Sequence, residues 1–587
     1  MASEKKKKEM EEQKQLVLNR YQWSEKWRRP WDDKWLRWYK AVRSVVPKLP
    51  KGEEDRSNLF IPYTYSTMDT VRSKLMTALF ERKPYIAYIP KDADDVDNAD
   101  NMETLVDTQL EKGSAYVKFF TLITDMLVYG VCPFETGWRY QTKTIKKRIP
   151  EMVNDILLGY QVTEDEVTLW DDPDFQPFMI DDLYPDPDGV DIDDGIWVIR
   201  KRFMTEKDLR EKEKQGIYKI GDWDEIKAGL EKVNRGKQDR LSSIGASHEI
   251  NVNQSDVGGR RYELLEMWQD DQVVSVVNQV QVIRDEPNPF WHGKKPFGLA
   301  KMDPLNGEFY GISLVELIEH LQAELNTTRN QRIDSNSIAI NRMWKVLKGA
   351  NIEPADLVSR PNGIVWVDQM DDVQELDYNP LDPSAFQEEM ITKQDIQEAT
   401  ATYSEARGAA TDGKRTATEN AIRDRSVSMR FEVKVKLFEH FGLKRLGMFF
   451  DQLNQQFIDD IRKVRVPNND EGGFDWMDIG PEQISGQYEY QPAGTAVEAT
   501  LDALNYRQNL LMLHREFKED PEIKTRELKK RIIEAYGIKD TESILKTEEE
   551  IAQEQQEAAM LLQQQQMQQQ ATNGGNPNPL VGGGVAI

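Results

Sequence analysis

Cysteine and histidine are scarce in this sequence, and their scarcity excludes several kinds of site. The single cysteine, Cys132, can form no disulfide within the chain. It lies in the apolar run 127–134, and no histidine is nearby in sequence. We therefore interpret Cys132 as a buried structural residue rather than a catalytic thiolate. The histidines are His248, His292, His320, His440 and His514. They are widely separated, and no His-x-x-x-His or Cys-x-x-Cys spacing occurs, so we expect no metal site of these types.

Apolar residues are also sparse, at 39% of the 587 residues, while charged residues make up 30%. No window approaches the roughly 18 consecutive apolar residues of a membrane helix. The first residues, with Lys5 to Lys8, lack the apolar core of a signal peptide, so we expect a protein that is cytosolic where it is made. The length predicts several domains or one extended subunit, because single cores stop growing at roughly 250 to 300 residues.

The formal net charge of -25 argues against a broad nucleic-acid-binding face, so any contact with DNA must be local or weak. Acidic clusters at 92–100 and 181–194 suggest metal binding, but neither has the required spacing. The second cluster has no oxygen ligand at Val190 and no glutamate that closes a calcium loop. A solvated turn is the favoured interpretation.

One nucleotide-binding pattern occurs, because residues 408–415 match the first seven positions of a P-loop. Arg415 stands where serine or threonine should bind magnesium, and residues 397–407 are helical in pattern where a strand is required. A loop between two helices fits this segment better. No Gly-x-Ser-x-Gly elbow is present. We therefore predict no enzyme activity, no catalytic residues and no cofactor.

The first half of the chain predicts a mixed α/β region. Residues 1–20 are charged and predict a flexible arm, and a tryptophan stripe then predicts a helix that restarts at Pro30 and packs its aromatic face on a neighbour. The alternative for the stripe is a clamp for single strands. The stripe consists of Trp23, Trp27, Trp31, Trp35 and Trp38. Further predicted elements are helices between 58 and 140, one of them over 99–127, strands at 83–90, 178–180 and 197–200, a hairpin of 262–268 with 273–277, and a surface loop at 234–259.

The second half predicts long helices interrupted by short strands. A stripe of leucine and isoleucine from 314 to 325 gives way to the polar residues 326–334 without a helix breaker, which is typical of a helix stabilised by neighbours. The later predictions are strands at 343–347 and 363–367, a helix at 383–406, a helix at 416–465 kinked at Gly442 and Gly447, strand and loop at 474–490, a helix at 497–536, a Gln-rich stretch at 553–570 and a disordered tail at 571–587.

This order of segments, together with the phrases Asn58–Tyr65 and Gly311–Asp334, resembles the portal proteins (head-tail connectors) of tailed double-stranded DNA bacteriophages, podovirus-type. The resemblance implies an α+β, mainly helical fold with wing, stem, clip and crown regions. The regions implied are an arm (1–20), the wing (21–310), stem helix 1 (311–341), the clip (342–380), stem helix 2 (383–406), the tunnel loop (407–416), the long wing helix with returning strands (417–494), the crown (495–570) and a tail (571–587).

The resemblance also implies a function and partners. Portals form a ring, commonly a dodecamer, at one capsid vertex, through which double-stranded DNA is packaged and ejected. The implied partners are terminase, the major capsid and scaffolding proteins, and the head-tail adaptor or tail proteins, with no membrane. The implied locations are the virion and, during assembly, the host cytoplasm. Two alternatives stay open: a head-tail adaptor and a component of the packaging motor.

Two groups of charged residues are candidates for contact with DNA in such a channel. An acidic lining would avoid gripping the phosphates, since each phosphate contact adds affinity. The lining candidates are Glu388, Glu389, Asp395, Glu398 and Glu405; the alternative for them is an ordinary solvated helix face. Lys414 and Arg415 could contact phosphates without reading bases, or lie in an exposed or intersubunit loop.

Overall fold

The structure is a computed structural model, and the chain divides into two compact units, Met1–Thr495 and Ala496–Ile587. The described residues are 2–80, 83–92, 95–153, 156–228, 235–245, 260–341, 343–350, 352–358, 364–376, 384–403, 429–468 and 473–492, with 510, 512, 514, 515, 529, 530 and 532 of the second unit. The predicted tunnel loop and the P-loop-like segment 408–415 lie outside them, as do the Gln-rich stretch, the tail and most of the predicted crown.

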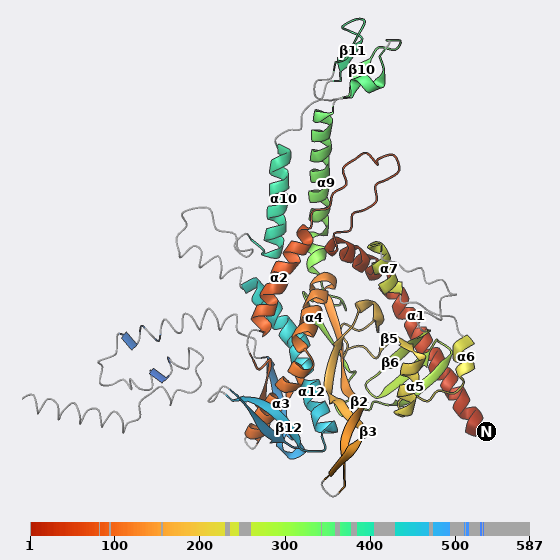
Figure 1. Cartoon of the computed structure of the whole chain (residues 1–587), viewed down its shortest axis with the longest axis vertical. Helices are drawn as coiled ribbons and strands as arrows, with labels where there is room; N and C mark the ends of the chain where they lie inside the picture. Colours follow the sequence, from red (N-terminus) through yellow and green to blue (C-terminus); the bar gives the residue numbers. More distant parts are fainter. Residues whose placement is uncertain are drawn as a thin grey trace, which may run out of the picture. The chain divides into compact units, whose positions relative to one another are not determined.

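The first element is one long helix, α1 (Ala2–Val42), which continues through Pro30 (Figure 1). The predicted arm at 1–20 and the predicted restart are therefore wrong. Val17 is buried, and Met10 and Leu18 pack against the same apolar cluster, so a few apolar positions tie this charged stretch to the fold. Pro30 lies on the exposed side of the helix, where the carbonyl group that loses its partner can bind water.

The tryptophan stripe packs on neighbouring elements, which confirms the packing interpretation. Trp27, Trp31 and Trp35 surround Tyr310, with ring centroids 5.5, 5.4 and 5.1 Å from it. Trp38 is buried, and its indole nitrogen donates a hydrogen bond to Glu319 at 3.0 Å. These contacts join α1 to the start of the long helix that follows residue 313.

Three helices and a short strand follow: α2 (Tyr63–Phe80), β1 (Ile86–Pro90), α3 (Val96–Lys112) and α4 (Ala115–Tyr129). The single helix predicted over 99–127 is divided between α3 and α4. The division falls at Gly113 and Ser114, where Ser114 has a left-handed φ of 53° that no helix can continue through. Phe80 of α2 stacks on Phe119 of α4 with ring centroids 4.3 Å apart.

A five-stranded antiparallel sheet has the order β4-β5-β6-β7-β8. Its strands are β4 (Leu183–Pro185), β5 (Val198–Thr205), β6 (Arg261–Trp268), β7 (Gln272–Val277) and β8 (Gln281–Pro287). The predicted hairpin is confirmed, with Leu264 opposite Val277. One face packs on α1 through Leu265 and Met267, and the other packs on α5 (Glu206–Lys214) and α6 (Trp223–Ala228) through Tyr262 and Leu264. Burial on both faces explains the nearly continuous apolar runs.

Two predictions near this sheet are wrong. Residues 178–180 form no strand, because a 3₁₀ turn, η2 (Ile180–Asp182), leads into β4. The predicted loop at 234–259 contains a helix, α7 (Arg235–Ser243), and its residues 246–259 lie outside the described part. Arg240 of α7 pairs with Asp181 and stacks over the ring of Tyr129, so a charged helix is held by ionic and ring contacts that sequence periodicity does not reveal.

A second sheet has the order β3-β2-β9 and contains a long hairpin that the sequence did not predict. Its strands are β2 (Val131–Val153), β3 (Ile156–Pro177) and β9 (Phe297–Lys301). The outer part of the hairpin carries charged pairs such as Lys146 with Glu164 and Lys147 with Asp165, both at 3.1 Å. Cross-strand ion pairs stabilise a sheet but leave no apolar alternation in the sequence.

Of the helix predicted over 416–465, residues 416–428 lie outside the described part, and the rest ends at Phe457 and is less regular than predicted. Residues 429–438 are α-helical, a π-helical turn follows at η6 (Glu439–Leu443), and α12 (Lys444–Phe457) completes the element. Gly442 lies in the π turn, as expected of a kink, whereas Gly447 lies in regular helix. A Cβ atom at Gly447 would come within 2.9 Å of Ile86, so this glycine permits close packing on β1.

The chain then returns to strands, which confirms the prediction for 474–490. The elements are β12 (Arg462–Asn468), β13 (Gly473–Ile479), η7 (Pro481–Gln483) and β14 (Tyr488–Pro492). β12 pairs with β13, and β14 pairs with β1. The residues 462–465, predicted as the helix end, belong to β12 instead.

The segment between these parts forms a helix pair, α9 (Leu314–Ile340) and α10 (Ser384–Thr400), which run side by side (Figure 1). Between them in sequence lie β10 (Trp344–Val346), η4 (Pro354–Leu357) and β11 (Val373–Glu375). The predicted strand at 363–367 is wrong, since β10 pairs with 373–375. The Gln369 N–H donates a hydrogen bond to the Asp372 carboxylate at 2.8 Å and closes a turn just before β11. The strand that pairs with β10 therefore begins at Val373, after the end of the predicted strand.

None of the helices in the described part is both long enough and apolar enough to cross a membrane.

Candidate functional surface on the α9–α10 pair

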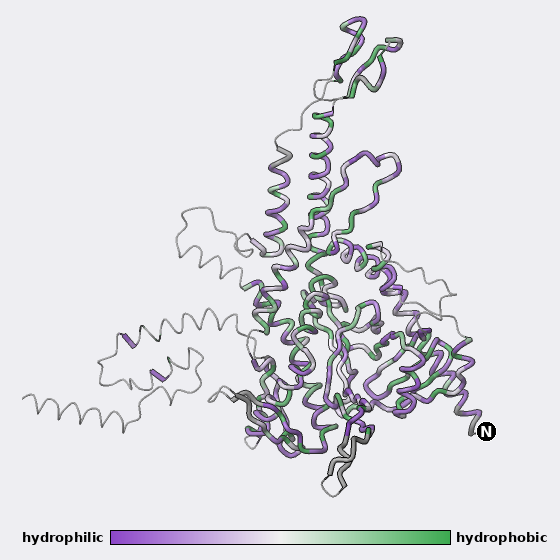
Figure 2. Tube along the Cα trace, viewed as in Figure 1, coloured by the Kyte–Doolittle hydropathy of each residue, from purple (hydrophilic) through white to green (hydrophobic). Residues whose placement is uncertain are grey.

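The α9–α10 pair has a small apolar base. Ile318 and Leu325 of α9 and Ile396 of α10 are fully buried together, with Ile61, Tyr63 and Leu321 packed around them. Ser313 caps α9 by accepting a hydrogen bond from the Glu316 N–H at 2.8 Å. Figure 2 shows that polar residues are frequent along both helices, so the contacts beyond this base must be largely polar.

The polar face of α9 binds residues 57–64 of the same chain, which we call the strap. Residues 57–62 precede α2, and residues 63 and 64 belong to its first turn. Four side chains spaced by four residues each accept a backbone N–H of the strap, at 2.9, 3.0, 2.8 and 2.6 Å. The pairs are Gln322 with Thr64, Asn326 with Ile61, Asn330 with Leu59 and Asp334 with Ser57. We call these four side chains the ladder.

Ladder amides also donate to the strap, since Gln322 and Asn330 bind the carbonyl groups of Ile61 and Leu59 at 2.9 and 3.1 Å. Four helical residues advance about 6.0 Å and two extended residues about 6.6 Å, so the contacts from Ser57 to Ile61 match the spacing along α9. The last step, from Ile61 to Thr64, covers three residues. Pro62 has no N–H, and the strap skips it. The expectation that neighbours stabilise this polar helix is confirmed. The spacing of amide and carboxyl groups by four residues was the signal for the partner, which the sequence analysis missed.

Glu389 lies between the two helices rather than on an exposed face. Its side chain is 7% exposed and pairs with Arg329, Arg332 and Lys393 at 3.2, 2.7 and 2.7 Å. A carboxylate held by three cations is a bridge between α9 and α10, and it offers no free negative charge. Its membership of the predicted acidic lining is therefore corrected.

The other members of the predicted acidic set have different positions. Glu388, Asp395 and Glu398 are exposed, and their spacing of seven and three residues places them on one side of α10. Glu405, Lys414 and Arg415 lie outside the described residues. The structure thus brings three of the five predicted carboxylates together on one exposed acidic face.

The C-terminal end of α10 is held by the helical residues 429–438. Arg430 donates hydrogen bonds to the carbonyl groups of Glu398 and Ala399 at 2.8 and 2.9 Å. A guanidinium at this position satisfies terminal carbonyl groups and complements the helix dipole. A pocket of about 300 Å³ lies beside it, lined by α2, both helices of the pair and residues 430–434.

At the other end of the pair, the segment from 343 to 376 exposes many apolar side chains. Trp366 is 82% exposed, Met370 90% and Leu347 63%. The two strands β10 and β11 have three residues each, and a two-stranded sheet of this size is marginal on its own. Exposed apolar surface of this density is typical of a contact surface for other chains.

The acidic turn at 186–195 is a turn, as predicted, but its carboxylates are used within the fold. Asp186 accepts the Ile196 N–H at 3.0 Å, and Asp194 accepts the Val190 N–H at 2.9 Å. Burial opposes ionisation of Asp193, yet hydrogen bonds from Arg445 and Lys294 hold its pKa well below the usual range. Among the residues that the structure describes, no group of three or more metal-binding side chains comes together.

Cys132 is fully buried in β2, and burial raises the pKa of its thiol well above the usual value. A raised thiol pKa opposes formation of the reactive thiolate. The interpretation of Cys132 as a buried structural residue is therefore confirmed.

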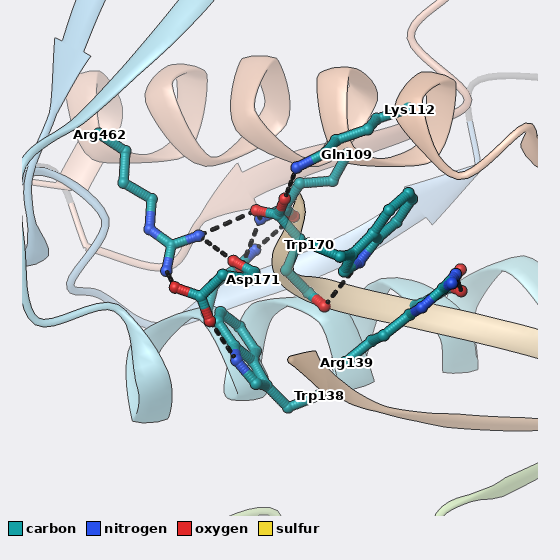
Figure 3. Close-up of polar contacts among 10 residues, drawn as sticks. Gln109, Lys112, Trp138, Arg139, Trp170, Asp171 and Arg462 are labelled. Atoms are coloured by element: carbon teal, nitrogen blue, oxygen red, sulfur yellow. Dashed lines mark hydrogen bonds and ion pairs between the residues drawn. The ribbon is translucent and has the colours of Figure 1, made fainter. Parts of the chain in front are cut away.

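A second pocket, of about 360 Å³, lies between α3, β3 and β12 (Figure 3). Arg462 of β12 binds the carboxylates of Asp171 and Asp172 at 3.0 and 2.9 Å. Lys112 of α3 also pairs with Asp172, and the Trp138 indole donates to Asp171 at 2.8 Å. Two of the lining cations, Lys112 and Arg462, are thus paired with carboxylates. Leu105, Leu169, Trp170 and Val464 add apolar surface to this mainly polar lining.

Comparison with known proteins identifies one family. The family model described as phage SU10 portal protein matches residues 160–573, which includes the α9–α10 pair and everything between its helices. No curated protein matches the chain.

Proposed function

The chain belongs to the phage SU10 portal protein family, and we propose that it forms a ring at one capsid vertex that conducts double-stranded DNA during packaging and ejection. The observation that carries the proposal is the match over residues 160–573, which spans the α9–α10 pair. In this assignment the wing is 21–310, α9 and α10 are the stem helices, 342–380 is the clip, and the crown is 495–570. The protein then acts as a virion component without enzyme activity.

The α9–α10 pair suits a conduit because few of its contacts depend on a thick apolar core. The ladder and the Glu389 bridge brace it from within one chain, which leaves its exposed surface for neighbouring copies and for DNA. The exposed apolar residues of 343–376 favour a contact surface at the clip. In this proposal, terminase and later the head-tail adaptor or tail proteins dock there, and capsid and scaffolding proteins contact the wing.

The acidic face of Glu388, Asp395 and Glu398 is the proposed channel lining. Carboxylates repel the phosphate backbone, so DNA can move past without being held. Lys414 and Arg415 of the tunnel loop stay candidates for phosphate contacts. The two groups differ in sign, and a channel that is mainly repulsive with one ring of cations would centre DNA without binding it tightly.

The test is the native mass of the purified protein over a range of concentration and salt, with electron micrographs of the same samples. We expect a closed ring with a central hole, of roughly 0.8 MDa for twelve subunits of 68.1 kDa each. A monomer or dimer under every condition, especially one that hydrolyses ATP, would contradict the proposal and favour a motor component or an adaptor.

The same rings test the lining. Neutralising Glu388, Asp395 and Glu398 together should increase retention of linear DNA at low salt. The control neutralises three exposed acidic residues far from α10 in sequence, Glu211, Asp224 and Glu225, and should leave DNA retention unchanged. Equal retention by both variants would remove the acidic face from the channel.

A further inference from the structure

We propose that Trp291 of one copy of the chain inserts into the pocket between α3, β3 and β12 of a neighbouring copy. The inference rests on the proposed ring and adds the residues that join adjacent wings. It comes from three features: a tryptophan that is fixed in place yet exposed, a pocket suited to an indole, and the position of the two at opposite edges of one sheet.

Trp291 lies in the loop between β8 and β9, and its side chain is 68% exposed. Gln456 of α12 accepts the Trp291 backbone N–H at 3.0 Å and donates to the Pro289 carbonyl group at 2.8 Å. The preceding residue, Phe290, stacks on Trp268 with ring centroids 5.8 Å apart.

The next residue is fixed as well, because His292 packs between Phe290 and Phe449 at 5.1 and 4.8 Å. The backbone of Trp291 is therefore held on both sides while its indole faces solvent. Such a side chain loses little conformational freedom on binding, which is the property of an interface anchor.

Two other tryptophans are as exposed but are presented differently. Trp366 is 82% exposed, but it lies in residues 364–367, which form no helix or strand. Trp476 is 67% exposed and has Arg465 directly opposite it in the β12–β13 pair. A cation directly across a sheet gives an indole a partner within its own chain.

The pocket offers an indole both apolar walls and cations. Leu105 and Val464 are buried in its walls, and Leu169 is 47% exposed at its rim. Cations already lie over indole rings here: Lys112 is 4.9 Å from the centroid of Trp170, and Arg462 is 5.3 Å from that of Trp138. A volume of about 360 Å³ accommodates a further indole.

The anchor and the pocket lie at opposite edges of one sheet and on different sides of helix α12. In the sheet of order β3-β2-β9, the pocket is lined by 168–172 of β3, whereas Trp291 precedes β9 on the other edge. Helix α12 repeats this division. Asn454 bonds to Gln109 in the pocket wall at 2.8 Å, and Gln456 bonds to the Trp291 loop, about 200° further around the helix.

A subunit with an anchor on one side and a pocket on the other makes a head-to-tail contact. Contacts of this heterologous kind propagate from copy to copy and close into a ring when the rotation allows. Each copy would use Trp291 toward one neighbour and its own pocket toward the other, so every junction in the ring is identical.

The test uses two variants that damage opposite sides of the junction. Trp291→Ala removes the anchor and keeps the pocket. Leu169→Trp obstructs the pocket from its exposed rim and keeps the anchor. Either variant alone should raise the concentration needed for assembly on the order of 30-fold or more, the effect of losing a tryptophan anchor at an interface. Mixed in equal amounts, the two should form a discrete dimer containing one copy of each, because only one intact junction exists between them.

Mass photometry over a concentration series, with thermal melting to confirm that each variant is folded, gives the readout. Trp476→Ala is the matched control and should assemble like the unmodified protein. Normal rings from Trp291→Ala would overturn the inference and leave the ring function standing. Loss of assembly in the control, or a mixture without the dimer, would overturn the assignment of this pocket. An unmodified protein that never assembles would overturn both the inference and the proposed function.

Discussion

The five-stranded sheet and the α9–α10 pair are stabilised in different ways. The sheet buries apolar side chains on both faces, against α1 on one side and α5 and α6 on the other. The helix pair has a small apolar cluster at its base, and the ladder and the Glu389 bridge add polar contacts to it. The sheet is stabilised by its own core. The helix pair is held by polar contacts and exposes apolar residues, so contacts with neighbouring copies can stabilise it further.

The largest effect on stability is expected when apolar side chains are truncated in the two regions. Leu265 is fully buried in the sheet, so Leu265→Ala should lower the free energy of unfolding by about 3 kcal/mol or more through lost burial and a cavity. Met390 on α10 is 72% exposed, and Met390→Ala should change the stability of the isolated subunit by less than about 0.5 kcal/mol. Chemical denaturation of the subunit measures both. Similar losses from the two variants would show that the helix pair is no different from the sheet.

A smaller effect is expected at the bridge between the helices. Glu389→Gln leaves Arg329, Arg332 and Lys393 without their shared carboxylate, and Arg332 is only 13% exposed. We expect a loss of roughly 2 kcal/mol, below the value for a fully buried pair because two of the cations are partly solvated. Glu388→Gln, one residue earlier and exposed, is the control and should be neutral. Limited proteolysis between residues 341 and 384 would report separation of the helices, and equal cleavage in both variants would rule out the bridge.

The smallest effect concerns a single contact of the ladder. Asn330→Ala removes the acceptor of the Leu59 N–H and the donor to the Leu59 carbonyl group, which should cost about 1 kcal/mol. Hydrogen exchange at residues 57–61 should accelerate, while exchange in the sheet stays unchanged. Asn336→Ala, at an exposed position of the same helix, is the control. Unchanged exchange at Leu59 would mean that the strap is held by something other than the ladder.

The elements that sequence patterns predicted well are those whose apolar residues follow the period of the element. The β6–β7 hairpin and the starts of α9 and α10 lie within a few residues of their predicted positions. The long β2–β3 hairpin was missed because its outer half is paired through charges such as Lys146 and Glu164, which leave no apolar alternation. The arm was wrong because Val17 and its neighbours, though few, reach a buried cluster that only the tertiary structure supplies.

The candidate site was less predictable than the fold. The sequence gives the sign of each charged side chain but does not show whether that side chain is exposed or buried. Glu388 and Glu389 are adjacent and chemically alike, yet one is exposed and the other is surrounded by three cations. Helical geometry separates them by about 100°, but the direction of the neighbouring helix is needed to decide which one is buried. The amides of the ladder were visible as a spacing of four residues, but their partner lies some 265 residues earlier in the chain.

The ladder also makes the length of α9 depend on the length of the strap, although the two segments are far apart in sequence. From Ser57 to Ile61, each contact advances about 6.0 Å along α9 and about 6.6 Å along the strap, so the mismatch grows by about 0.6 Å per step. A few contacts can tolerate this drift, but a long series would fall out of register. Between Ser57 and Ile61, an insertion of four residues in α9 therefore requires two residues in the strap, and an unmatched insertion would break every contact beyond it. In related chains, length changes in these two segments should occur together or not at all.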